Sequence, residues 1–157
     1  MRLNSFDVLN AFSAQLQRSV NSENFKTKVV VTPSSINEAG VVIKVSLLKT
    51  FVEQQPPAAR SARTVRLRVS VCGSAGSMTG LHQALCAIEA LDEFFLRDSL
   101  RLETEHPDGN VRGVPNSRII QYVSEEDSFT DDPDSTFVQY VQDDRIVIIQ
   151  LFNNYSY

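Results

Sequence analysis

A short segment rich in glycine and serine, residues 73–80, stands where a strand is expected to lead into a helix. Phosphate-binding loops and nucleophile elbows occur at such junctions. A phosphate-binding loop places Lys after its last glycine, but Leu81 follows Gly80 here. A nucleophile elbow places Ser midway between two glycines, but Met78 stands midway between Gly76 and Gly80. We therefore interpret the segment as a plain strand-to-helix turn, and a small ligand-binding domain or enzyme that holds an anion there stays as an alternative.

The soft metal ligands of the chain are Cys72, His82, Cys86 and His106. His82 and Cys86 are four residues apart, so they share a face if the segment is helical. A zinc site needs three or four converging ligands, and no second pair with metal-ligand spacing is present. We predict no metal and no cofactor, with Cys86 as a small residue beside the core and His82 at the surface. Two cysteines do not make a disulfide framework, which indicates a reducing compartment.

Carboxylates gather in one stretch, 125–134, which we call the acidic segment. Acid–base catalysis needs a carboxylate that is removed from water, whereas consecutive acids beside Pro and Ser are typical of a solvated loop. A calcium-binding loop needs glycine at its sixth position, but counting from Asp127 or Asp132 gives Asp132 or Phe137. The segment therefore predicts a solvated or partner-facing loop. Its carboxylates are Glu125, Glu126, Asp127, Asp131, Asp132 and Asp134.

Four arginines form a basic cluster: Arg60, Arg63, Arg66 and Arg68. Arg66 and Arg68 alternate with apolar residues, so they project from one face of the predicted strand. Two interpretations stay open, a solvated sheet face or an electrostatic contact with the acidic segment of a neighbouring copy. Opposite patches on one subunit favour head-to-tail contacts, which close into rings. Nucleic-acid binding is disfavoured, because aromatic residues do not interleave with the arginines and the net charge is −4.

Two helices are predicted from apolar residues that recur at helical spacing. The first spans about 5–20 and carries Leu9, Phe12 and Leu16 on one stripe, with Asn4 or Ser5 as its cap. The second spans about 78–97 and carries its own apolar stripe. Both stripes are expected to pack on a sheet.

Strands are predicted at 28–32, 41–52, 64–72 and 118–123, and 100–103 is a further candidate. Apolar residues on both faces of 41–52 predict a central strand. A hairpin is predicted for 136–142 and 145–152, with Asp143-Asp144 as its turn. The pair Pro56-Pro57 excludes ordinary ladder pairing, so a protruding hairpin or loop is expected around 53–63. This order of elements predicts an α+β fold, with two main helices on one face of a mixed, largely antiparallel sheet.

Bulk properties agree with one domain over 1–157. The chain is 42% hydrophobic and 22% charged, which is ordinary globular composition. No run approaches the roughly 18 apolar residues that span a bilayer. Because the first twenty residues alternate polar and apolar types, they are not a signal peptide, and we expect folding in a cytoplasm without export.

One stretch leads to a resemblance. The strand Val65-Arg66-Leu67-Arg68-Val69-Ser70-Val71 runs into the Gly/Ser turn and then into an apolar helix. With the first helix (4–20), the strands at 28–71 and the closing strands at 118–152, this order resembles the phage tail terminator (tail completion) proteins. The resemblance extends over nearly the whole chain, as an architecture rather than as a motif.

The resemblance implies a structural assembly protein rather than an enzyme. It implies a homo-oligomeric, hexameric ring that caps the head-proximal end of the tail tube, stops tube growth and presents a surface to the head. The implied partners are other copies of the chain, the tail tube protein and head–tail connector proteins, with no membrane and no specific nucleic acid, although DNA has room to pass through the ring. The implied location is the virion, after assembly in the host cytoplasm. The basic cluster and the acidic segment are the expected interfaces, and another head–tail connector or baseplate subunit is the alternative assembly role.

Overall fold

The first helix, α1 (Ser5–Val20), begins at a side-chain cap. In the computed structural model, the Asp7 N–H donates to Asn4 Oδ1 (2.8 Å) and the Asn4 N–H donates to Asp7 Oδ2 (3.0 Å). This reciprocal pair satisfies two backbone donors that a helix start leaves without partners. The predicted bounds are confirmed, and of the two predicted caps, Asn4 or Ser5, the structure shows Asn4. The structure describes residues 3–20, 28–32, 41–54, 62–74, 78–96, 100–123, 128–131 and 139–152.

The second helix, α2 (Met78–Phe95), ends two residues earlier than predicted. Three phenylalanines join it to α1. The Phe12 ring meets the Phe94 ring edge-on at 6.1 Å between centroids, and Phe94 meets Phe95 edge-on at 5.0 Å. Edge-to-face contacts of this kind favour a fixed arrangement of the rings, so they set how the two helices lie against each other.

The sheet has six strands in the order β1-β2-β3-β8-β6, and β7 also pairs with β8. The pair β1–β2 is parallel, and the other pairs are antiparallel. β2 lies between β1 and β3, so the predicted central strand is confirmed. The strands are β1 (Lys28–Thr32), β2 (Val42–Gln54), β3 (Ala62–Ser74), β6 (Ser117–Val123), β7 (Ser128–Asp131) and β8 (Gln139–Phe152).

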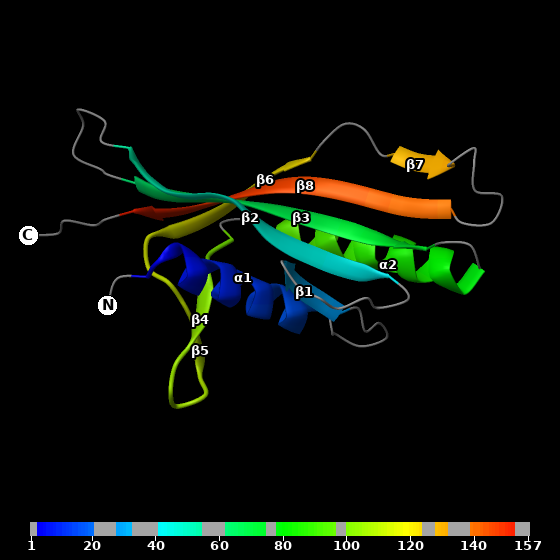
Figure 1. The fold of residues 1–157 in the computed structure, drawn as a ribbon. Helices are drawn as coiled ribbons and strands as arrows, with labels where there is room; N and C mark the ends of the chain where they lie inside the picture. Colours follow the sequence, from blue (N-terminus) through cyan, green and yellow to red (C-terminus); the bar gives the residue numbers. More distant parts are fainter. Residues whose placement is uncertain are drawn as a thin grey trace, which may run out of the picture.

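Both helices lie on the same face of this sheet (Figure 1). Alternate strand residues point at them and are buried, because side chains in a strand alternate between faces. This helix-covered face includes Ile43, Val45, Val65, Leu67, Val69, Val71, Ile119, Val147 and Ile149. No described helix covers the other face, which we call the open face. It is made of the intervening positions, among them Lys44, Lys49, Arg66, Arg68, Arg118, Ile120, Ile146 and Ile148. The predicted fold class, α+β with two helices on one sheet face, is therefore confirmed.

The predicted C-terminal hairpin is wrong. β8 is one strand of 14 residues that runs through Asp143 and Asp144. It pairs without interruption with β3, where Val71 lies opposite Asp143 and Ser70 lies opposite Asp144. A complete ladder satisfies the backbone groups of both strands, and this gain outweighs the local turn preference of two aspartates.

Three loop expectations also change. β7 lies inside the stretch predicted as an acidic loop. The β2–β3 hairpin keeps its strands to Gln54 and from Ala62, so the predicted excursion is shorter than expected, and its tip at 55–61 lies outside the described residues. The glycine-rich turn is shorter as well, because Ser74 ends β3 and Met78 begins α2.

A second, two-stranded sheet stands apart from the first and is formed by β4 (Glu103–Glu105) and β5 (Val111–Gly113). The candidate strand at 100–103 therefore begins only at Glu103, and its apolar residues Leu100 and Leu102 are buried in the core instead. A turn at 106–110 joins β4 to β5, with Gly109 at φ +82°. Within the described residues, no helix is long and apolar enough to cross a membrane.

Candidate interaction surface

The structure separates Arg63 from Arg66 and Arg68, which the sequence groups together. Arg66 and Arg68 are exposed on the open face. Arg63 lies on the helix-covered face with only 9% of its surface exposed, and its Nη1 donates to the backbone oxygen of Leu3 at 2.9 Å. Strand alternation explains the difference, since odd-numbered positions of β3 face the helices. Arg60 lies outside the described residues, so the structure supports an exposed pair rather than a cluster of four.

Strand pairing adds three cations to this pair. Lys49 lies opposite Arg66 across the β2–β3 ladder, and Lys44 lies two positions beyond Ser46, which pairs with Arg68. Arg118 projects from β6 at the far side of β8, opposite Gln150. All five side chains are exposed, and we call them the basic face: Lys44, Lys49, Arg66, Arg68 and Arg118. No described ion pair joins any of them to a carboxylate.

Sequence reasoning missed Lys44, Lys49 and Arg118 as members of this surface. Lys44 alternates with Ile43 and Val45 in its strand, which was a usable signal for exposure. Lys49 follows two leucines and Arg118 stands between Ser117 and two isoleucines, so neither shows this alternation. Their gathering depends on sheet order and register, which one strand alone does not reveal.

Isoleucines lie between the cationic strands. Ile146 pairs with Arg68 and Ile148 pairs with Arg66, and Ile120 of β6 pairs with Ile148. Ile146 is 40% exposed, although it belongs to a type that is usually buried. The basic face is therefore a mixed surface, with apolar contact area at its centre and positive charge on either side.

The structure describes only one of the six carboxylates of the acidic segment. Asp131 ends β7 opposite Gln139, while Glu125, Glu126, Asp127, Asp132 and Asp134 lie outside the described residues. Its expected contact with the arginines of a neighbouring copy stays a prediction.

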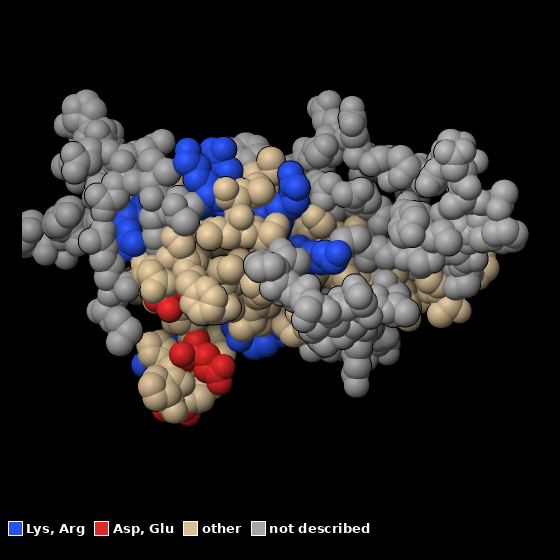
Figure 2. All heavy atoms as spheres, viewed as in Figure 1, with Lys and Arg blue, Asp and Glu red and all other residues tan. Residues whose placement is uncertain are grey.

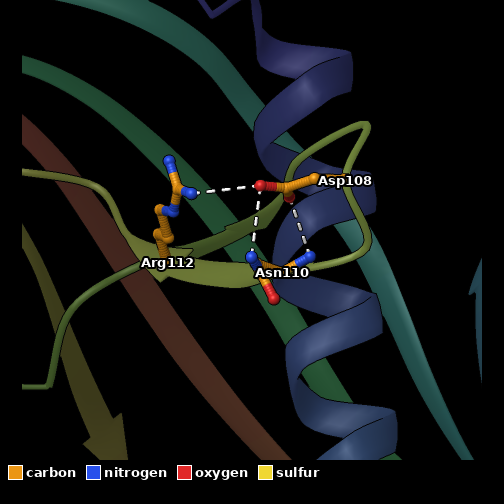
Figure 3. Close-up of polar contacts among 3 residues, drawn as sticks. All are labelled: Asp108, Asn110 and Arg112. Carbon is orange, nitrogen blue, oxygen red and sulfur yellow. Dashed lines mark hydrogen bonds and ion pairs between the residues drawn. The ribbon is translucent and has the colours of Figure 1, made fainter.

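The acidic side chains that are visible in the space-filling view gather elsewhere. Figure 2 shows most of the visible Lys and Arg over the sheet, and most of the visible Asp and Glu on the β4–β5 hairpin. At the hairpin tip, Asp108 accepts hydrogen bonds from the backbone N–H of Asn110 (2.9 Å) and its Nδ2 (3.1 Å), and it pairs with Arg112 Nη2 at 3.1 Å (Figure 3). These contacts hold the tip and place the Arg112 guanidinium beside the Asp108 carboxylate.

The base of the hairpin is held by a buried glutamine. Gln15 of α1 is 3% exposed; its Nε2 donates to the Arg101 oxygen and its Oε1 accepts from the Glu103 N–H, both at 2.9 Å. Arg18 adds an ion pair to Glu103 at 3.5 Å. The hairpin is thus attached to α1 through side chains, which compensates for the weak stability of an isolated two-stranded sheet.

One arginine that the sequence did not single out is buried under the sheet. Arg145 is 2% exposed, on the helix-covered face opposite Val69. Its Nη2 pairs with Asp92 Oδ1 at 2.7 Å, and its Nη1 lies 3.3 Å from Gln121 Oε1. A buried guanidinium is tolerated only when it is paired and hydrogen-bonded, so this group links α2 to β8 and β6.

Two of the candidate metal ligands, His82 and Cys86, lie close together. His82 is exposed as predicted, and Cys86, which is partly buried, lies with its Sγ 3.7 Å from His82 Nε2. In the part of the chain that the structure describes, no three residues of the metal-binding types come together. Residues 75–77 of the Gly/Ser turn are not described, so the alternative of an anion site stays untested there.

The open face is thus the described surface that combines exposed cations with apolar area. Searches against models of known protein families and against curated protein sequences found no match to this chain.

Proposed function

We propose that this chain is a structural assembly protein of the phage tail terminator kind. In this role it forms a homo-oligomeric ring, expected to be a hexamer, at the head-proximal end of the tail tube. The ring stops tube polymerisation and offers a joining surface to head–tail connector proteins.

The observation that carries the proposal is the open face. Within the described residues no helix covers one face of the sheet, and that face holds five exposed cations around a row of isoleucines. Ile120, Ile146 and Ile148 lie side by side on this face, and contiguous apolar area at a surface marks an interaction site. Charge at the edges with apolar area at the centre is the composition of a protein interface.

The order of elements supports the family assignment within this proposal. An N-terminal helix, a long β2–β3 hairpin, a second helix and closing strands follow one another as the resemblance implies. The long hairpin and the uncovered face leave extended surfaces on which one copy can meet the next or a tube subunit.

The direct test is solution mass by light scattering over a wide concentration range, with negative-stain images of each species. We expect a discrete oligomer with an open centre, and shorter tubes when tail tube protein polymerises in the presence of the chain. A monomer at every concentration that also leaves tube length unchanged would overturn the proposal. Arg66→Glu with Arg68→Glu is the matched disruption, and Arg101→Glu, also exposed but away from the open face, is its control.

A further inference from the structure

The outer face of α2 carries more apolar surface than a solvated helix needs. Met78 is 81% exposed, Leu85 is 40% exposed and Leu96, just past the helix end, is 78% exposed. The spacings of 7 and 11 residues are about two and three helical turns, so the three side chains form one line. The inner face of α2 is already covered, since Ala84, Ala87, Leu91 and Phe94 are buried. A helix that is apolar on both sides is typical of an element buried on both sides.

Acidic residues flank this apolar line. Glu89, Asp92 and Glu93 are all exposed, and α2 contains no Lys or Arg. Asp92 pairs with Arg145, whereas no described ion pair involves Glu89 or Glu93. The outer face of α2 therefore combines apolar area with negative charge, and the open sheet face combines apolar area with positive charge.

The two surfaces lie on opposite sides of the molecule. α2 packs its inner side against β3 and β8, so its outer side points away from the sheet, while the basic face points the other way (Figure 1). They therefore do not meet within one copy, but each is free to meet its complement on another. A contact between two different surfaces of one chain is head-to-tail, and it closes into a ring when each copy is rotated suitably relative to the last.

We infer that the open basic face of one copy binds the outer face of α2 of a second copy. This inference rests on the proposed function, because it names the contact by which the homo-oligomer forms. Arg66, Arg68 and the neighbouring lysines face Glu89 and Glu93, and the isoleucines of β8 pack against the line of Met78, Leu85 and Leu96.

The β4–β5 hairpin is a weaker candidate for the same place. Two of its carboxylates are already paired, Asp108 with Arg112 and Glu103 with Arg18. Glu105 is left for a partner, and Val111 is the one apolar side chain of the two hairpin strands. The outer face of α2 matches the basic face in both charge and apolar area.

The test uses two charge-reversed chains. One carries Arg66→Glu and Arg68→Glu, and the other carries Glu89→Lys and Glu93→Lys. Each chain alone places like charges across the contact, so we expect its half-assembly concentration to rise about tenfold or more relative to the unaltered chain. Mixed in equal amounts, the two chains restore opposite charges at every contact of an alternating oligomer, and assembly should return. Melting curves of each chain alone show that both are folded.

The outcomes separate this inference from the proposed function. Restored assembly in the mixture supports the inference. Unaltered assembly of the Glu89→Lys, Glu93→Lys chain overturns it but leaves the ring intact, whereas an unaltered chain that stays monomeric and also leaves tube length unchanged overturns the proposed function itself. Glu105→Lys is the matched control, and loss of assembly in that variant alone would place the hairpin, rather than α2, on the basic face. A different result would also overturn the inference. In it, the unaltered chain does not self-associate but binds duplex DNA, and the chain with Arg66→Glu and Arg68→Glu does not bind the DNA.

Discussion

The two faces of the sheet use the same residue type for opposite purposes. Arg145 and Arg68 come from neighbouring strands, and Arg68 lies opposite Ile146, the residue that follows Arg145. Arg145 is 2% exposed and paired with Asp92 under the helices, while Arg68 is exposed on the open face. One guanidinium holds layers together and the other is available to a partner, so position in the pleat, rather than residue type, decides what an arginine does here.

The strongest test of this contrast removes one arginine from each face. Arg145→Ala takes the cation away from Asp92 and leaves a cavity between α2 and β8, and we expect a loss of about 4 kcal/mol in the free energy of unfolding. Arg68→Ala should change it by less than about 0.5 kcal/mol under conditions where the chain is monomeric. Urea unfolding followed by circular dichroism measures both. Equal losses would mean that the open face also contributes to the fold of the single chain.

Apolar residues on the two faces should differ in the same way. Leu67 is 0% exposed beneath the helices, so Leu67→Ala should cost about 3 kcal/mol. Ile146 is 40% exposed, so Ile146→Ala should cost about 1 kcal/mol or less. The Ile146 variant should instead weaken self-association, measured by light scattering. An Ile146 variant that loses stability as Leu67→Ala does, and associates normally, would contradict an interface on the open face.

Salt offers a test that needs no substitution. Exposed charges are screened over about 10 Å at 0.1 M salt, whereas a buried pair is screened much less. Raising salt from about 0.1 to 0.5 M should weaken self-association about tenfold, or about 1.4 kcal/mol, with little change in thermal stability. Association that strengthens with salt would point to a contact dominated by the isoleucines.

The smallest expected effect comes from keeping the charge. Arg68→Lys preserves a cation on the open face but loses the planar donor geometry, and it should change the association free energy by less than about 0.5 kcal/mol if attraction between patches is what matters. A loss as large as that of Arg68→Glu would indicate a bidentate contact to a carboxylate instead. Sedimentation at matched concentrations distinguishes the two results.

Much of the fold followed from local patterns. The stripe of Leu9, Phe12 and Leu16 and the cap at Asn4 predicted α1 with its observed bounds, because helix periodicity and capping depend on near neighbours. Clean alternation predicted that Arg66 and Arg68 share a face, and strand pairing agrees. The prediction of a turn at Asp143-Asp144 was wrong because a local turn signal competed with a long ladder to β3. Residues close along the chain do not indicate that ladder.

The sequence by itself determined which segments are helices, which faces of β3 are apolar and cationic, and that no recognised catalytic motif is present, since each depends on residues close along the chain. Only the tertiary structure decided that Arg63 and Arg145 are buried and that Lys44, Lys49 and Arg118 join Arg66 and Arg68. These features depend on strand order and register, which follow from burying apolar area across the whole sheet rather than from the preference of any single segment.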